Sequence, residues 1–313
     1  VVKRCFFENI KYGIFVGEYN DVSKVDISNC SFNGNNVGLY TQAFNVGGDA
    51  GGNFRDVSIR NSSFSNCTRK GIYCEKLSDA LLENISVHNS GTSTNNVSPK
   101  PGNNGIDINL KYRSDYKNIT IRNSSIRQCG APGSATTNAE LSRNQAIKIS
   151  CQDVDTTGAA PKATLKGVQM RNNIVEGVYF DMIISSGSLD PSTGVDLSDM
   201  TIEGCYFIHG DAGGSTAQSG LLINSDGTLD LSHNYWNASG GPTTGSITGG
   251  TPSGGNGIIE NNDINADFTQ SNERTQQIFG KDASGTYTSY SSLSNAFTNA
   301  SSGDSIMGIP AGS

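Results

Sequence analysis

Asp107 and Lys148 are the two side chains whose types and positions could act together on a substrate. Each stands between two isoleucines, in residues 105–108 (Gly-Ile-Asp-Ile) and 146–149 (Ala-Ile-Lys-Ile). Successive side chains of a strand point to opposite faces, so both charges should lie on the face that the isoleucines do not bury. A carboxylate beside an ammonium could exchange protons with a substrate or bind a polar ligand. We take both residues as candidate catalytic groups and ligand contacts.

The equivalent outward position in the neighbouring segments is mostly aromatic. Adjacent strands of a sheet lie about 4.8 Å apart, so these positions would form a row. Aromatic rings flanked by hydrogen-bonding groups suit sugar rings. The alternatives are that a loop covers the row or that the rings pack against one another. In chain order the row reads Phe15, Tyr40, Tyr73, Asp107, Lys148, Tyr179 and Leu222.

A second outward row, on another set of strands, is largely basic. Arg binds carboxylates through paired hydrogen bonds, so this row could contact carboxylated or sulfated glycans. The alternative is a solvated face that keeps the strands soluble. The row comprises Ser28, Arg60, His88, Arg122, Arg171 and Glu203. Its three arginines are candidate ligand contacts.

Two acidic pairs, Asp153 with Asp155 and Asp196 with Asp199, could offer oxygen ligands to Ca²⁺. Such pairs are also ordinary in turns. The cysteines and histidines lack the spacing of zinc sites. We therefore expect no cofactor, and calcium is the one metal that these acids could bind.

A repeated unit of roughly 30 residues accounts for the spacing of all these positions. Each unit has an apolar–polar–apolar strand, a turn residue that is usually Asn, an apolar residue, and a second strand that usually starts with Gly. Alternating apolar residues are typical of half-buried strands. Trp236 falls at the inward position that Phe32 and Phe64 occupy, so we expect it in the core.

Stacked units of this kind predict an all-β parallel solenoid, because each coil can bury its apolar residues only against its neighbours. Equivalent asparagines would form a ladder whose amides bond from coil to coil. Asn also tolerates the left-handed conformation of tight turns. We therefore assign these asparagines a structural role. The predicted ladder consists of Asn29, Asn61, Asn89, Asn123, Asn172 and Asn261.

Over residues 1–270 the chain resembles the right-handed parallel β-helix superfamily, the pectin-lyase-like fold, and most of all its secreted and surface-anchored bacterial repeat proteins. The resemblance rests on the repeat and on residues 233–237 (His-Asn-Tyr-Trp-Asn) with Gly-Gly-Pro at 240–242. It implies a right-handed parallel β-helix of about nine coils.

The polygalacturonases of this superfamily carry acids around a Gly-Ile strand and one coil later. Here Asn103, Asn104, Asn144 and Gln145 stand at those places, and Asp107 is the acid that remains. Glycoside hydrolysis needs two carboxyl groups that flank the scissile bond. The resemblance therefore favours the fold and disfavours a hydrolase of that family.

The predicted domains are a β-helix over residues 1–270 and a polar linker over 271–286. Residues 287–313 resemble the cap helix and first strand that open β-helices of this class, so we expect a second β-helix to start there. The alternative is that 287–313 folds back on the preceding coils. The chain opens in mid-repeat at Val1, and we interpret it as part of a longer protein.

Charge and hydropathy exclude two classes of partner. The chain has 22 basic against 29 acidic residues, so no basic field recruits nucleic acid. Its apolar runs are too short for membrane insertion as a helix. Seven cysteines leave at least one thiol unpaired or bonded to another chain, and their alternative role is as small buried hydrophobes.

These observations favour an extracellular or cell-surface module, stalk or adhesin-like, that contacts a polysaccharide or cell-surface glycan. A first alternative is a polysaccharide lyase or glycoside hydrolase with a site near Asp107, Lys148 and Tyr179. A second is a purely structural solenoid that stacks through uncapped ends.

Overall fold

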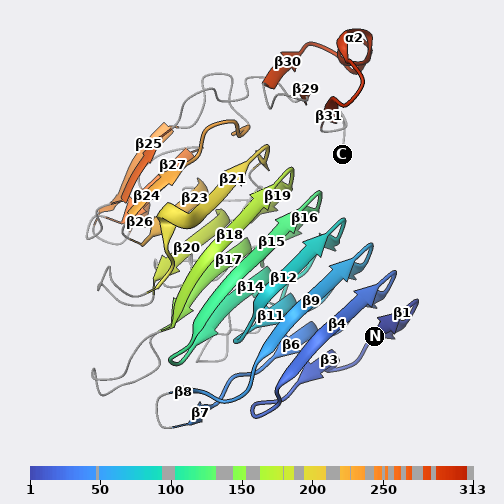
Figure 1. Ribbon diagram of the computed structural model, residues 1–313, viewed down its shortest axis with the longest axis vertical. Coiled ribbons are helices and arrows are strands. Elements are labelled where there is room, and N and C mark those ends of the chain that lie inside the picture. Colours follow the sequence, from blue (N-terminus) through green and yellow to red (C-terminus); the bar gives the residue numbers. More distant parts are fainter. Residues whose placement is uncertain are drawn as a thin grey trace.

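The computed structural model describes most of residues 1–313. The residues outside the description are 47–48, 94–102, 132–143, 153–162, 179, 187–193, 209–218, 226, 237–242, 249–250, 253–256, 262–265, 270–277, 283–286 and 309–313. Strands of successive coils lie side by side along the long axis of the molecule (Figure 1). The chain is therefore an all-β parallel β-helix, as the repeat predicts.

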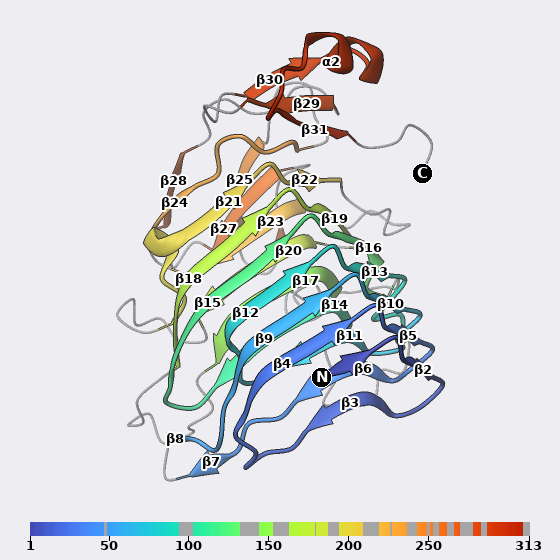
Figure 2. The ribbon, with the colours of Figure 1, turned by 45° about the vertical axis from the view of Figure 1, so that its right-hand side comes forward.

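Three sheets, here called A, B and C, run the length of the coils (Figure 2). Sheet A contains, in spatial order, β1 (Val2–Lys3), β4 (Val22–Ser28), β9 (Phe54–Arg60), β12 (Ser78–Glu83), β15 (Asp115–Arg122), β18 (Thr164–Arg171) and β21 (Met200–Glu203). Sheet B contains β2 (Phe6–Glu8), β5 (Ser31–Asn33), β10 (Ser63–Ser65), β13 (Ser86–His88), β16 (Ser125–Cys129), β19 (Ile174–Gly177) and β22 (Tyr206–Phe207).

Sheet C is the longest and carries the predicted row of outward residues. Its strands are β3 (Tyr12–Val16), β6 (Val37–Thr41), β11 (Lys70–Cys74), β14 (Asn103–Lys111), β17 (Asn144–Gln152), β20 (Phe180–Ser186), β23 (Ser219–Asn224), β27 (Gly257–Asn261), β25 (Thr243–Thr248) and β26 (Thr251–Pro252). All pair in parallel except β25 with β26.

The core lies between the three sheets and repeats from coil to coil. Rings at one inward position of sheet B stack face to face, with centroids 4.7 Å apart for Phe7 and Phe32 and 4.5 Å for Phe32 and Phe64. Trp236 is fully buried and stacks on Phe207 at 4.5 Å, which confirms its predicted place in the core. Such stacks add to the free energy of apolar burial in the coils that contain these rings.

The cysteines belong to this packing. All seven are free thiols and six are buried. Burial raises the pKa of the Cys205 thiol to about 12, so this group stays protonated at neutral pH. The interpretation as small buried hydrophobes is confirmed for these six.

Each coil turns from sheet A to sheet B through one residue with positive φ. This residue is Asn29, Asn61, Asn84, Asn123 and Asn172 in successive coils, and their φ angles lie between 48° and 56°. The Asn84 amide donates to Asn61 Oδ1 at 2.7 Å, and the Asn172 amide to Asn123 Oδ1 at 3.2 Å. The predicted ladder is therefore present. It pairs the side-chain amides of asparagines whose left-handed backbone conformation few residue types other than glycine adopt.

Two members of the predicted ladder are wrong. Asn89 belongs to a second ladder at the turn after sheet B, where its amide donates to Asn66 Oδ1 at 2.8 Å. Asn84 takes its place in the first ladder. Asn261 lies in β27 of sheet C, in which Ile259 pairs with Leu222.

Glycine at the start of the sheet C strands has a steric cause. A Cβ atom on Gly38 would lie 2.5 Å from the carbonyl oxygen of Gly71 and 2.6 Å from the Phe64 ring. The coil bends there over the buried phenylalanines, and only a residue without a side chain fits.

The C-terminal residues fold differently from the coils. β29 (Ile278–Lys281) pairs antiparallel with both β30 (Tyr287–Tyr290) and β31 (Ser305–Gly308), and α2 (Leu293–Asn299) connects these last two strands. A helix and a strand follow Tyr290, and β29 lies within residues 271–286, the segment predicted as a linker. The predicted division into a β-helix, a linker and the start of a second β-helix stays a prediction.

Two short pairs of strands and one helical turn complete the described fold. β24 (Gly227–Asp230) pairs with β28 (Ala266–Thr269), β7 (Asn45–Val46) pairs with β8 (Asp49–Ala50), and the single turn η1 (Leu197–Asp199) precedes β21. In the part of the chain that the structure describes, no helix has the length and apolar character needed to cross a membrane.

Candidate functional site

The outer face of sheet C brings the predicted row together over five coils. Strand register pairs Phe15 with Tyr40, Tyr40 with Tyr73, Tyr73 with Asp107, and Asp107 with Lys148. The predicted order of these five side chains is therefore confirmed. Their role in binding a ligand stays a prediction.

The row changes beyond Lys148. Tyr179 lies outside the described residues, and the partner of Lys148 in the next coil is Ile183 of β20. Leu222 follows Ile183 in register, as predicted for the end of the row. In the described part of the chain, Ile183 therefore stands in register with Lys148, and the predicted role of Tyr179 stays a prediction.

The aromatic rings of the row pack on one another. Tyr40 and Tyr73 are stacked with centroids 4.9 Å apart, and Phe15 is tilted against Tyr40 at 5.3 Å. The other face of Tyr73 meets the Lys70 ammonium, 3.4 Å from the ring centroid. Both faces of Tyr73 are occupied, so it offers a ligand its edge and hydroxyl rather than a stacking platform.

Lys70 forms an ion pair with Asp107 that sequence reasoning missed. Lys70 Nζ lies 2.5 Å from Asp107 Oδ2, and the two residues are only 5% and 2% exposed. Burial by itself would raise the pKa of Asp107, but the charges of Lys70 and Lys148 and hydrogen bonds outweigh it and hold the pKa below its ordinary value. Asp107 is therefore an anion at neutral pH.

A second buried acid, Glu75, directly follows β11, the strand that carries Lys70 and Tyr73. Its Oε1 accepts hydrogen bonds from the Tyr73 hydroxyl at 2.6 Å and from Lys111 Nζ at 2.5 Å. Its Oε2 accepts the backbone N–H of Ala43 at 3.1 Å. These partners satisfy Glu75 within the protein and fix the tyrosine hydroxyl.

Several buried polar atoms beside Asp107 lack a partner. Within the described part of the chain, Asn104 Oδ1, Asp107 Oδ1 and both amide atoms of Gln145 make no hydrogen bond. Gln145 pairs in register with Asn104, so the unpaired groups share one place on adjacent strands. Leaving a buried polar atom unpaired costs about 1–3 kcal/mol. These atoms are closed to solvent in this structure, so a polar ligand could supply the missing partners only after the side chains above them move aside.

The basic row predicted on sheet A is neutralised by acids. Glu83, rather than His88, stands between Arg60 and Arg122, and its carboxylate lies 3.4 Å from Arg60 Nε and 2.6 Å from Arg122 Nη2. Arg171 pairs with Glu203 at 3.1 Å. The placement of His88 is wrong, because this residue lies in β13 of sheet B. The stripe mixes basic and acidic side chains that pair with each other, which supports the solvated-face interpretation.

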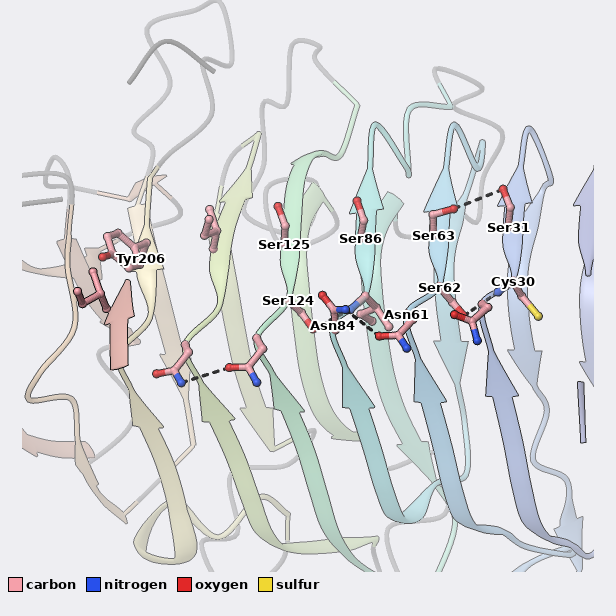
Figure 3. A pocket seen from close by; sticks show the side chains of 16 residues that line it. Cys30, Ser31, Asn61, Ser62, Ser63, Asn84, Ser86, Ser124, Ser125 and Tyr206 are labelled. Carbon is pink, nitrogen blue, oxygen red and sulfur yellow. Dashed lines mark hydrogen bonds between the residues drawn. The ribbon is translucent and has the colours of Figure 1, made fainter. Parts of the chain in front are cut away.

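A groove of about 810 Å³ follows the turn between sheets A and B (Figure 3). Asn61 and Asn84 lie side by side in its lining and point toward each other, and Ser31 and Ser63 lie beside them (Figure 3). Ile306 of β31 lies at the groove as well. These amide and hydroxyl hydrogen bonds run from coil to coil, so we attribute this groove to the packing of the turn.

The acidic pairs considered for calcium do not form a site in the described residues. Asp196 caps η1, accepting from the Ser198 N–H at 3.0 Å and from its hydroxyl at 2.6 Å. Asp153 and Asp155 lie outside the described residues. Among the described residues, no group of three acidic, histidine or cysteine side chains could hold a metal ion.

Comparison with protein-family models, with curated proteins and with solved structures finds no match to this chain. The fold and the arrangement on sheet C are therefore the basis for a functional proposal.

Proposed function

We propose that this chain is an extracellular or cell-surface β-helix module that binds carbohydrate on the outer face of sheet C. Asn104, Asp107, Gln145 and Lys148 would make the contacts. The observation that carries the proposal is the group of buried hydrogen-bonding atoms left unpaired beside Asp107.

The chemistry of these groups suits sugar hydroxyls. A hydroxyl both donates and accepts, while a carboxylate accepts and a primary amide does both. Asn104 Oδ1 and Asp107 Oδ1 could accept two ligand hydroxyls, and the Gln145 amide could bond a third. Lys148, half-buried beside Asp107, adds three donors. Such an array of directional hydrogen-bonding groups would bind a polyhydroxylated ligand more tightly than an apolar one.

The aromatic row has a supporting role in this proposal. Phe15 is 48% exposed at one end of the row, and the tyrosines present edges and hydroxyls. An extended glycan could lie along these edges from Phe15 to Lys148. The pectin-lyase-like resemblance of the repeat agrees with a carbohydrate ligand, although one fold serves many functions.

An enzyme is the second candidate, favoured by the adjacent Asp107 and Lys148. A glycoside hydrolase needs a protonated carboxyl as its acid, usually with a raised pKa. The lowered pKa of Asp107 is the opposite of this requirement. A lyase needs a base to remove a proton, and an ionised Asp107 does not conflict with that requirement. The test below therefore also follows bond cleavage.

The test measures binding of neutral and acidic polysaccharides to the wild-type chain on an array, followed by titration calorimetry with the oligosaccharide bound best. Gln145→Ala and Lys148→Ala should each weaken binding about tenfold, which corresponds to about 1.4 kcal/mol. Both changes remove ligand contacts and leave the ion pair of Lys70 with Asp107 intact.

Arg60→Ala is the matched control, because it removes a charge from sheet A and should leave affinity unchanged. Weakened binding in this control and not at Gln145 would move the site to sheet A. New reducing ends or unsaturated products during incubation would favour the enzyme. If no glycan binds, the carbohydrate proposal is wrong and the purely structural solenoid becomes the favoured explanation.

A further inference from the structure

Lys76 is a fully buried lysine whose ammonium is surrounded by backbone carbonyl oxygens. It lies in the turn between β11 and β12. Its Nζ donates to the carbonyl oxygens of Gly17, Glu18, Asn20 and Gly51 at 3.1, 3.0, 2.8 and 3.3 Å. Four acceptors thus converge on a group with three donor hydrogens.

The four oxygens come from two loops of earlier coils. Gly17, Glu18 and Asn20 belong to the connection between β3 and β4, and Gly51 belongs to the connection between β6 and β9. The Thr41 hydroxyl donates to the carbonyl oxygen of Lys76 at 3.0 Å and fixes the turn from which the side chain extends. One side chain therefore ties together three consecutive coils at one edge of sheet C.

The surroundings of the ammonium resemble a site for a monovalent cation. Carbonyl oxygens can replace the hydration shell of such an ion. The negative ends of four peptide dipoles favour a positive charge, and Asp21 adds to this at longer range. Burial opposes the charged form and lowers the pKa of Lys76, so the oxygens must offset the lost hydration.

The loops held in this way also contact each other. The rings of Tyr19 and Phe44 lie 4.7 Å apart, and the Gln42 amide donates to Glu18 Oε1 at 2.6 Å. Gly52 has a φ of 71°, and a Cβ there would lie 2.4 Å from the carbonyl oxygen of Asn20. The two loops thus pack closely around the backbone oxygens, and they adjoin the strands that carry Phe15 and Tyr40.

We propose that the four carbonyl oxygens form a cation-binding cage in which Lys76 acts as a tethered ion that locks the two loops. When Lys76 is replaced by alanine, the four oxygens bind a free potassium or methylammonium ion in place of the lysine ammonium. The proposal is independent of carbohydrate binding, because it concerns backbone groups at the loop edge rather than the outer face of sheet C.

The test compares Lys76→Ala with the wild type by hydrogen exchange of the amides in residues 17–22 and 49–54. Without a cation, exchange in these loops should rise about tenfold or more, because the loops open locally. Potassium chloride or methylammonium chloride should restore the protection, and tetramethylammonium chloride at equal ionic strength should not, because this ion has no N–H donor and is too large. Lys117→Ala, at an exposed lysine, is the matched control and should exchange like the wild type.

Unchanged hydrogen exchange in Lys76→Ala would contradict the claim that Lys76 holds the two loops together. Faster exchange that no cation reverses would contradict the claim that the four oxygens bind a free cation. A measurement on the wild type covers the case in which the variant fails to fold. Side-chain ¹⁵N NMR should show Lys76 as a charged, slowly exchanging ammonium at neutral pH. A neutral amine signal for Lys76 would refute the proposal.

Discussion

Replacing Asp107 with alanine is expected to lower the free energy of unfolding by about 3–5 kcal/mol, because the buried ammonium of Lys70 loses its carboxylate. Lys70→Met should cost less, since Lys148 remains near the Asp107 carboxylate. Urea unfolding at neutral pH measures both losses, provided that the slope with denaturant is unchanged.

The double variant Lys70→Met with Asp107→Leu is the control that separates the ion pair from packing. Apolar side chains of similar size can replace a buried pair at little cost, so the double variant should recover to within about 1 kcal/mol of the wild type. Losses below about 0.5 kcal/mol in both single variants would show that the pair is solvated, as surface pairs are.

The acid limb of the stability curve gives a second view of the same pair. The pKa of Asp107 lies below its ordinary value, so its contribution to stability is complete at neutral pH. This contribution decreases once the pH falls below the ordinary pKa of the unfolded chain, and it is lost completely as the pH falls through the lowered pKa. The Asp107→Ala variant should therefore lose less stability than the wild type between neutral and acid pH.

Phe64→Ala is expected to cost about 3–5 kcal/mol, because it removes a fully buried ring from the middle of the core. Phe64 stacks on Phe32 and pairs in register with Val87, so the cavity opens between coils and cannot be filled from one side. Urea unfolding measures this loss.

Phe6→Ala is the matched control for Phe64→Ala. Phe6 lies on sheet B as well but is 86% exposed, and its removal should change stability by no more than about 0.5 kcal/mol. Equal losses at Phe6 and Phe64 would contradict the assignment of Phe64 to the core between coils.

The sequence predicts the fold and the row from Phe15 to Lys148 because alternation sets the face of each strand and the leading small residue, Gly or Ala146, sets the register. It fails at Glu83 and His88 for a physical reason. Both turns around sheet B use a left-handed Asn, so residues 85–89 match the pattern of a first strand as well as residues 80–84 do. The strand register, which sequence alone leaves open, decides between them.

Lys70 and Gln145 could not be predicted as buried residues. Each stands directly before the small residue that opens the repeat's second strand, so the repeat pattern does not set the face on which its side chain lies. Their burial depends on contacts with neighbouring side chains, such as Asp107 beside Lys70, which strand periodicity does not encode. The unpaired atoms that support the functional proposal therefore emerge only from the structure.

The central claim is that carbohydrate binds on the outer face of sheet C. A crystal structure of the wild-type chain with the oligosaccharide bound best on the array tests it most directly. The account predicts sugar hydroxyls within hydrogen-bond distance of Gln145, Asn104 and Asp107 Oδ1, the atoms now unpaired. An oligosaccharide bound over sheet A, or in the groove beside Asn61 and Asn84, would contradict it.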